Sequence, residues 1–193
     1  MKRLFIAINL PEKVKDELEE NIKEISGLFP EESRRGVASW VEREKLHLTL
    51  LFIGGVRDEN IPAVCEAARA VAEKHGPFDI QLKRICYGPP RKIPPRLIWL
   101  ELVKNEHLTV IANELKERMS EAGLLTKFED RPFSAHITLA RIKAWQWRKI
   151  EPDEQPDIER DISLNFEAKS IEVMESVLKR SGAEYAILER ISL

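Results

Sequence analysis

The sequence predicts an α+β fold with mostly antiparallel sheets backed by helices. Segments with the two-residue period of strands outnumber the three segments with helical period. Three helices are too few for every pair of strands to be joined by a parallel crossover. The pattern His-aliphatic-Thr-Leu occurs twice, at residues 47–50 and 136–139, nearly half a chain apart. This repeat indicates two halves related by a pseudo-two-fold axis.

The first half of the chain alternates strands and helices. Pro11 suits the first turn of a helix, and Gly27 and Pro30 end that helix. Gly54-Gly55 is expected to stop the strand that carries the first repeat, and Gly76-Pro77 ends the next helix. The expected elements are a strand at 2–8, a helix at 11–28, strands at 38–41 and 46–53, and a helix at 59–75.

The second half contains more strands. A Pro-rich connection at 88–95 separates two of them, and residues 143–160 are polar apart from Trp145 and Trp147. Ser181-Gly182 is expected to form the turn of a C-terminal hairpin. The expected elements are strands at 78–87 and 97–102, a helix at 106–122, a strand at 133–141, strands at 162–166 and 169–174, and hairpin strands at 177–179 and 185–188.

The bulk properties fit one domain, or two small lobes that share a cleft, because the chain has 193 residues. A chain of this length buries roughly 70% of its unfolded surface, so it needs no metal or disulfide to fold. Cys65 and Cys86 lack metal-ligand spacing and are expected to be core thiols in a reducing compartment. The sequence has neither a signal peptide nor an apolar run of membrane length, so a cytoplasmic location is expected.

The formal net charge of −2 argues against tight, sequence-independent binding to long nucleic acids. A small anionic group held by a few local cations is compatible with this charge. Arg91, Lys92 and Arg96 form a local basic cluster that would suit an RNA backbone, and a solvated loop is the equal alternative.

The two repeats place polar side chains in apolar strands, where such side chains need a reason. Side chains alternate along a strand, so His47 shares a face with Thr49, and His136 shares a face with Thr138. Two such strands side by side would bring two imidazoles and two hydroxyls to one point. A structural coincidence is the alternative. The remaining histidines, at positions 75 and 107, lie near helix termini and are expected to be solvated.

This set of groups suits the opening of a cyclic phosphodiester. A base must take a proton from water, an acid must protonate the leaving ribose oxygen, and histidine serves either role near neutral pH. A threonine hydroxyl can donate to a non-bridging phosphate oxygen. No cluster of Asp or Cys accompanies either histidine, so neither a metal nor any other cofactor is indicated.

The two repeats and their flanks resemble the two-histidine (2H) phosphoesterase superfamily, and in particular its LigT-like branch of RNA 2′,3′-cyclic phosphodiesterases, also named 2′-5′ RNA ligases. The resemblance covers nearly the whole chain. The matching segments run from Arg3 to Ile8, from Trp40 to Gly54, from Pro95 to Leu100, from Phe133 to Arg141, from Ser176 to Leu178 and from Gly182 to Tyr185.

This resemblance implies a single bilobal α+β domain over residues 1–193 whose two repeats face a central cleft. It also implies hydrolysis of 2′,3′-cyclic phosphates to 2′-phosphates without a metal. Joining of RNA ends through 2′-5′ linkages without ATP would be the reverse reaction. Carried over by position, His47 is the general acid and His136 the general base. Thr49, Thr138 and Arg141 would hold the phosphate. Further candidates for substrate binding are Phe5, Ser134 and Tyr185. Phe5 could be a stacking platform for a base, and packing within the sheet is its alternative.

Three positions fit the family pattern less simply. Ala135 stands where several members have Pro, and Lys45 stands where Asn is common. Strict alternation would place Arg141 on the core face with Ile137 and Leu139. Arg141 must therefore lie beyond the end of the strand, or a bulge must turn its side chain around. A solvated cation at a strand end is the alternative interpretation of Arg141.

The expected partner is RNA that ends in a 2′,3′-cyclic phosphate, with tRNA fragments as one source, and the expected state is a monomer without membrane contact. Trp145 and Trp147 are candidates for lining the nucleotide end of the cleft, and capping the core is their alternative. Two other functions stay open: a module that binds RNA ends without turnover, and an enzyme for another small cyclic phosphate. A basic track from the repeats would favour RNA, and an acidic or neutral cleft a small substrate.

Overall fold

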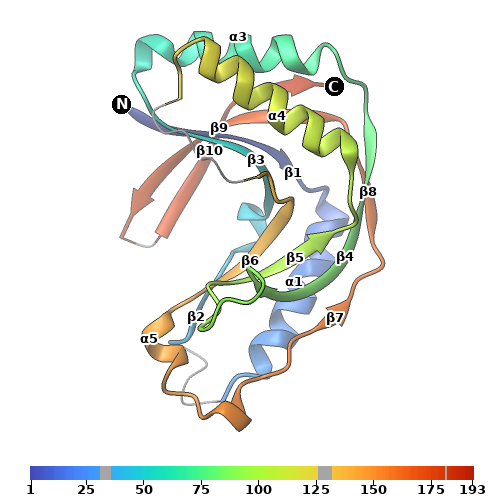
Figure 1. Cartoon of the computed structure of the whole chain (residues 1–193), viewed down its shortest axis with the longest axis vertical. Coiled ribbons are helices and arrows are strands. Elements are labelled where there is room, and N and C mark those ends of the chain that lie inside the picture. The colour runs from blue at the N-terminus through green and yellow to red at the C-terminus, as the bar shows by residue number, and fades with distance from the viewer. Residues whose placement is uncertain (31–35, 126–131, 181) are drawn as a thin grey trace.

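The computed structural model describes residues 1–30, 36–125, 132–180 and 182–193 (Figure 1). It contains one sheet of ten strands, ordered β10-β9-β1-β3-β6-β5-β4-β7, with β2 beside β6 and β8 beside β4. All pairings among the described strands are antiparallel, and the predicted α+β class is confirmed. The strands are β1 (Lys2–Asn9), β2 (Ala38–Trp40), β3 (His47–Val56), β4 (Phe78–Gly88), β5 (Leu97–Leu102), β6 (His136–Ile142), β7 (Arg160–Asp161), β8 (Asn165–Ala168), β9 (Ser170–Lys179) and β10 (Gly182–Ser192).

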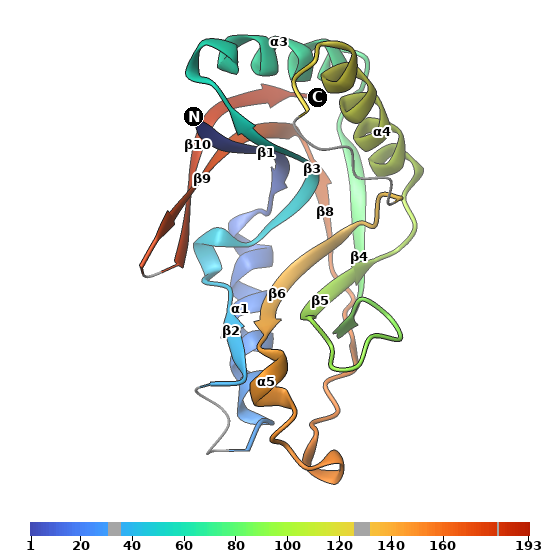
Figure 2. The same cartoon turned by 60° about the vertical axis from the view of Figure 1, so that its left-hand side comes forward.

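The helices bury the apolar stripes that the sequence predicts. They are α1 (Glu12–Gly27), α3 (Ile61–Ala72), α4 (Glu106–Glu121) and the short α5 (Ala144–Trp147). Helices α3 and α4 lie side by side at one end of the molecule, and α1 lies towards the opposite end (Figures 1 and 2). Asn105 caps α4 by accepting a hydrogen bond from the backbone N–H of Leu108 at 3.1 Å. Within the described ranges, none of the helices is long and apolar enough to cross a membrane.

The two strands that carry the repeats meet in the middle of the sheet through a single residue pair, Leu48 and Ile137. The pairing of β3 with β1 and the pairing of β6 with β5 have the same irregularity. Leu48 and Thr49 lie opposite Ile8 and Ala7 of β1, and the register then skips Leu50. The pairing of β6 with β5 is equivalent, with Leu100 and Trp99 opposite the second and third repeat residues, and it skips Leu139. Each repeat thus ends in a β-bulge at its leucine.

Several predicted bounds differ from the structure. The strand of the first repeat does not stop at Gly54 but continues to Val56, because Gly54, at a φ of 91°, accommodates a second bulge within the pairing to β1. The strand of the second repeat starts at His136 rather than at 133. The helix predicted at 59–75 is shorter, since residues 58–60 form a 3₁₀ turn before α3.

The C-terminal hairpin is longer than predicted. Strands β9 and β10 pair from Lys179 and Gly182 to Ser170 and Ser192, so tertiary pairing extends both strands beyond their clearly alternating segments. Ser181, which the predicted turn includes, lies outside the described residues. Of the predicted strand at 162–166, only residues from 165 onward belong to β8, which pairs with β4.

Burial confirms both cysteines as core thiols, since Cys65 and Cys86 are buried. His107 is exposed, as predicted. The prediction for His75 is wrong: its side chain is only 12% exposed and its Nε2 lies 3.0 Å from Oε2 of Glu114. His75 follows the end of α3, which packs against α4, and so comes within reach of Glu114, a contact that local sequence could not show.

Candidate active site

A cleft of about 1070 Å³ lies where the two repeats meet. It is lined by the eight residues that the sequence suggested for catalysis and substrate binding, and by others that the sequence did not suggest. The suggested residues are His47, Thr49, His136, Thr138, Arg141, Phe5, Ser134 and Tyr185. The strands β3 and β6 supply the two histidines and the two threonines, β1 supplies Phe5, and β10 supplies Tyr185. The fold therefore gathers residues from both ends of the chain.

The two imidazoles are held in the same way. Nδ1 of His47 lies 2.7 Å from the carbonyl oxygen of Lys45, and Nδ1 of His136 lies 2.8 Å from that of Ser134. A carbonyl oxygen only accepts, so each Nδ1 carries a proton and each Nε2 is left to exchange one. Nε2 of His47 also lies 3.1 Å from Oγ1 of Thr49. Both neutral histidines are therefore the Nδ1–H tautomer, and Nε2 is the nitrogen available for proton transfer in each.

Burial lowers the pKa of both histidines below the usual value of 6.5. The positive charge of Arg141 lowers the pKa of each one further, and a charge on His136 also lowers the pKa of His47. The hydrogen bonds to the carbonyl groups of Lys45 and Ser134 act in the opposite direction, because they favour the protonated rings. The net shift keeps both rings mostly neutral at pH 7.

Aromatic rings surround each histidine differently. The ring centroids of Phe5, His47 and Tyr185 lie 5.1 to 5.2 Å from one another. The ring of Trp99 lies 4.6 Å from that of His136. Sequence reasoning did not select Trp99 for the site, although Trp99 lies directly opposite Thr138 in the sheet. Only the pairing of β5 with β6, which the sequence does not specify, could have revealed it.

Residues of β4 contact Trp99 closely. Its indole N–H donates to the sulfur of Cys86 at 3.2 Å, and its side chain is buried. Gly88 faces the indole so closely that a Cβ on Gly88 would lie 2.3 Å from Cδ2 of Trp99. The end of β4 therefore fixes the ring that packs against His136.

The bulge in β6 decides where Arg141 points. Because the register skips Leu139, alternation reverses, so that Ala140 and Ile142 are buried while Arg141 is exposed and lines the cleft. The sequence allowed either a bulge or a position beyond the end of the strand for Arg141, and the structure has the bulge.

The charge that lines the cleft is one-sided. Lys45, Arg96, Lys116 and Arg141 line it, and no Asp or Glu does so among the residues that the structure describes. Lys45 is paired with Glu42 at 2.9 Å. Of the predicted basic cluster, Arg96 lines the cleft, whereas Arg91 and Lys92 are exposed outside it. The cleft therefore favours an anionic ligand in a chain whose net charge is −2.

The two tryptophans that follow the second repeat do not line this cleft. Trp147 is buried against Phe29 and Tyr87, with ring centroids 6.4 and 5.1 Å away, and so caps the core as the alternative interpretation proposed. Trp145 is 59% exposed, and Nζ of Lys149 lies 4.9 Å from its ring.

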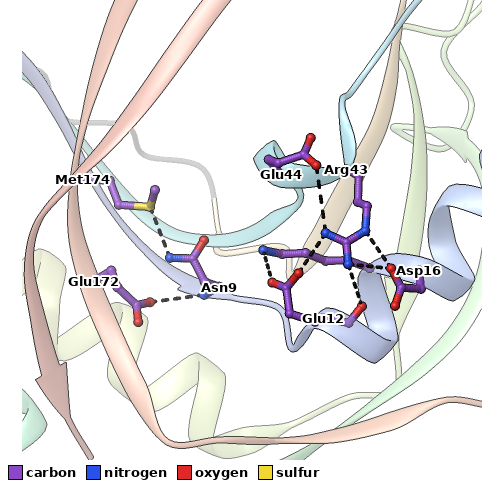
Figure 3. Close-up of polar contacts among 8 residues, drawn as sticks. Asn9, Glu12, Asp16, Arg43, Glu44, Glu172 and Met174 are labelled. Carbon is purple, nitrogen blue, oxygen red and sulfur yellow. Dashed lines mark hydrogen bonds and ion pairs between the residues drawn. The ribbon is translucent and has the colours of Figure 1, made fainter.

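Ion pairs fix the 3₁₀ turn, Arg43–Lys45, that leads into the first repeat. The guanidinium of Arg43 lies between the carboxylates of Glu12 and Asp16 on α1 (Figure 3), with Nη1 2.8 Å from Glu12 and Nε 2.7 Å from Asp16. This anchors the backbone that presents the Lys45 carbonyl to His47. On β9, buried Glu172 accepts from the backbone N–H of Asn9 at 3.2 Å (Figure 3). Asn9 in turn pairs with His47 in the sheet.

The described ranges contain no group of three or more His, Cys, Asp or Glu side chains that could hold a metal ion. What this site offers is acid–base chemistry at two imidazole nitrogens beside hydroxyl and guanidinium donors.

Comparison with known proteins gives matches along nearly the whole chain. The family model described as LigT like phosphoesterase matches residues 10–99 and again residues 100–185, so each match contains one repeat. A protein of Thermotoga maritima named RNA 2′,3′-cyclic phosphodiesterase is 31% identical over 96% of this chain and 92% of its own length. One of Archaeoglobus fulgidus with the same name is 29% identical over 95% and 96%.

Solved structures agree with these matches. The crystal structure of TT0787 of Thermus thermophilus superposes with a TM-score of 0.81 at 28% identity, over 99% of this chain and 97% of that one. The crystal structure of E. coli LigT complexed with 3′-AMP superposes with a TM-score of 0.78 at 25% identity, over 100% and 98% of the two chains. The architecture described above is therefore shared with both structures.

Proposed function

The chain belongs to the LigT-like phosphoesterase family, and from this premise we propose that it hydrolyses the 2′,3′-cyclic phosphate at the end of an RNA to a 2′-phosphate. The relatives in Thermotoga maritima and Archaeoglobus fulgidus carry the name of this activity. The 3′-AMP bound to E. coli LigT is a nucleotide with its phosphate on the ribose.

One observation carries the proposal. Two histidines line one cleft, and the Nδ1 atom of each is hydrogen-bonded to a backbone carbonyl group, which leaves Nε2 available for proton transfer. The described lining of that cleft contains Lys and Arg side chains but no Asp or Glu. A cyclic phosphodiester needs one proton removed and one proton supplied on opposite sides of the phosphorus. The anionic phosphate accounts for the one-sided charge, and a basic lining favours RNA over a neutral ligand.

In the proposed step, neutral His136 takes a proton from water through Nε2 while the water oxygen forms a bond to phosphorus. The bond from phosphorus to the 3′ oxygen breaks, and His47, protonated on Nε2, gives its proton to that oxygen. The products are a 2′-phosphate, a free 3′ hydroxyl, neutral His47 and protonated His136. Proton exchange with solvent restores the starting state, and the two transfers can each contribute roughly 10²–10⁴-fold.

The remaining lining residues have supporting roles in this proposal. Thr49 and Thr138 donate hydroxyl hydrogen bonds to the non-bridging oxygens, and Arg141 offsets their charge. Phe5 is buried and packs within the sheet against His47 and Tyr185, so it supports Tyr185, which forms the side of the cleft that a nucleoside can contact. Ser134 contributes its carbonyl to His136.

Four finer parts of the sequence-based expectation stay predictions. They are 2′-5′ ligation as the reverse of the same step, tRNA fragments as the source of the RNA ends, a monomeric state, and a cytoplasmic location. The division into two lobes that carry one repeat each is also our proposal, and the matching bulges after Leu48-Thr49 and Ile137-Thr138 support it.

The test is incubation of the purified protein in EDTA with a short RNA ending in a 2′,3′-cyclic phosphate, followed by identification of the product end. We expect a 2′-phosphate. His47→Ala and His136→Ala should each reduce turnover by about 10²-fold or more while the protein stays folded.

His107→Ala is the matched control, because His107 is exposed outside the cleft, and it should keep full activity. A 3′-phosphate product would reverse which ribose oxygen leaves. Binding of the RNA without reaction would support the non-catalytic alternative and contradict the enzyme.

A further inference from the structure

Arg96 is a second arginine in the cleft, and the proposed reaction does not use it. It lies just before β5, and its side chain is exposed and lines the same cleft as the two histidines. Its backbone is fixed on both sides: its N–H donates to the carbonyl of Gly88 at 3.1 Å, and its carbonyl accepts from Ile142 at 2.8 Å. The residue therefore has a set position relative to β6.

The register of β5 against β6 gives the order of groups along the cleft. Glu101 lies opposite His136, Trp99 opposite Thr138, and Leu97 opposite Arg141. Arg96 is the next residue beyond this last pair. At ~3.3 Å per residue its backbone lies roughly 16 Å along the strand from the position of His136. Arg96 therefore begins one residue farther from His136 than Arg141, which the proposed reaction places at the phosphate between the histidines.

The surroundings of Arg96 leave its charge available. Among the described residues it has no carboxylate partner, whereas Arg43, Arg84 and Arg190 each form an ion pair with a glutamate. Pro89 and Pro90 form the cleft lining beside it, and neither side chain offers a hydrogen-bond acceptor. A guanidinium on such a wall suits the two oxygens of a phosphodiester.

We propose that Arg96 binds a backbone phosphate of the RNA strand that leads to the cyclic end. The strand then runs from the histidines past Arg141 towards Pro89 and Pro90. The consequence is substrate selection: an oligonucleotide gains a contact that a cyclic mononucleotide lacks. This inference rests on the proposed function and adds the length of the substrate to it.

The experiment compares a nucleoside 2′,3′-cyclic monophosphate with a tetranucleotide that ends in the same cyclic nucleoside. Wild type should have the higher kcat/KM on the tetranucleotide. Arg96→Gln should lower kcat/KM on the tetranucleotide about tenfold and affect the mononucleotide far less, because one charge-assisted contact is lost. Arg91→Gln is the matched control: it removes the same charge from the same loop, but Arg91 does not line the cleft.

Other results would overturn the inference. Equal losses on both substrates would place Arg96 at the reacting phosphate or in the fold. No loss on the tetranucleotide would exclude the contact. A selective loss in Lys116→Gln but not in Arg96→Gln would direct the strand past α4 instead.

A binding measurement separates this inference from the proposed function. A labelled tetranucleotide ending in a 2′-phosphate is titrated by fluorescence anisotropy at several salt concentrations. The slope of log K against log salt should be smaller by about 0.7 in Arg96→Gln than in wild type, as expected for one lost phosphate contact. Equal slopes overturn the role of Arg96 even if turnover is absent, whereas absent turnover with the smaller slope contradicts only the proposed reaction.

Discussion

The carbonyl groups of Lys45 and Ser134 determine the chemistry of single residues in this site. Each one fixes the ring of the histidine two positions later and leaves its Nε2 facing reactants. The same two-residue offset in both repeats means that the backbone, rather than a carboxylate, orients both imidazoles. Burial and Arg141 then keep both rings mostly neutral. The proposed reaction needs His47 protonated on Nε2 and His136 neutral, so only a minority of molecules at pH 7 is in the reactive state.

Arg141 makes the pH dependence testable. Because both histidine pKa values lie below 6.5, the bell-shaped profile of kcat/KM should have its maximum on the acidic side of pH 6.5. Arg141→Gln removes a positive charge that disfavours protonation, so both pKa values should rise and the maximum should move to higher pH. Arg141→Lys keeps the charge and should keep the position of the maximum. An unmoved maximum in Arg141→Gln would contradict this electrostatic role.

Among single residues, the sequence predicted those that belong to the two repeats and missed those whose role depends on contacts between distant segments. The two His-aliphatic-Thr-Leu repeats identified residues that all line one cleft. Trp99 was overlooked because its place beside His136 depends on the pairing of two strands. His75 was misjudged because its partner, Glu114, lies on α4, 39 residues further along the chain.

Two β-bulges are the decisive features among the elements. The bulge at Leu50 and the bulge at Leu139 each follow the threonine of a repeat, and they change which face the next residues occupy. In β6 this turns Arg141 into the cleft. The sequence allowed for a bulge there, but alternation alone could not choose it over a strand end.

The contact between the end of β4 and Trp99 on β5 supports a prediction. Gly88→Ala would place a Cβ 2.3 Å from the indole, so the ring must shift away from the position that packs against His136. Such overpacking should cost about 1–3 kcal/mol of unfolding free energy and should also lower kcat. Urea unfolding and turnover measure the two effects.

Gly76→Ala is the control for this change, because a Cβ there meets nothing within 4 Å. It should alter the unfolding free energy by less than about 0.5 kcal/mol. If Gly88→Ala behaves like Gly76→Ala, the close contact with Trp99 is not present in the protein.

Element bounds were predicted well where local signals act and poorly where pairing decides. The strand at 97–102 and the start of the helix at residue 106 match the structure. The long hairpin of β9 and β10 was cut short in the prediction, since Glu175 and Ser176 interrupt its alternation while β1 and β10 still pair with it. Gly54 was mistaken for a strand end because a positive φ serves turns and bulges alike.

For the molecule as a whole, the lowered histidine pKa values connect function with stability. Above pH 6.5 both rings are neutral in the folded and the unfolded chain, so their protonation does not affect folding. As the pH falls through 6.5, the unfolded chain takes up protons first, which favours unfolding. The site should therefore destabilise the protein progressively on mild acidification.

The measurement is Tm between pH 7.5 and 5.5 for wild type and for the double variant His47→Gln/His136→Gln. Wild type should lose more Tm over this range, whereas the double variant should show a smaller decline, because it lacks both groups. Glu12, Glu101 and Glu189, whose pKa values lie below the usual 4.5, lose their stabilising pairs only at lower pH in both proteins. Parallel declines down to pH 5.5 would show that the histidine pKa values are not lowered.

The place of β1 between β3 and β9 has a consequence for synthesis on the ribosome. The first strand of the chain finds its neighbour β3 early, but its other edge stays open until residues 170–179 have been translated. Until then an unpaired strand edge is exposed to other nascent chains. Tyr185, on the last strand, also reaches the cleft only then. Both repeats are therefore made well before the enzyme can be complete, and activity should appear only with the final hairpin.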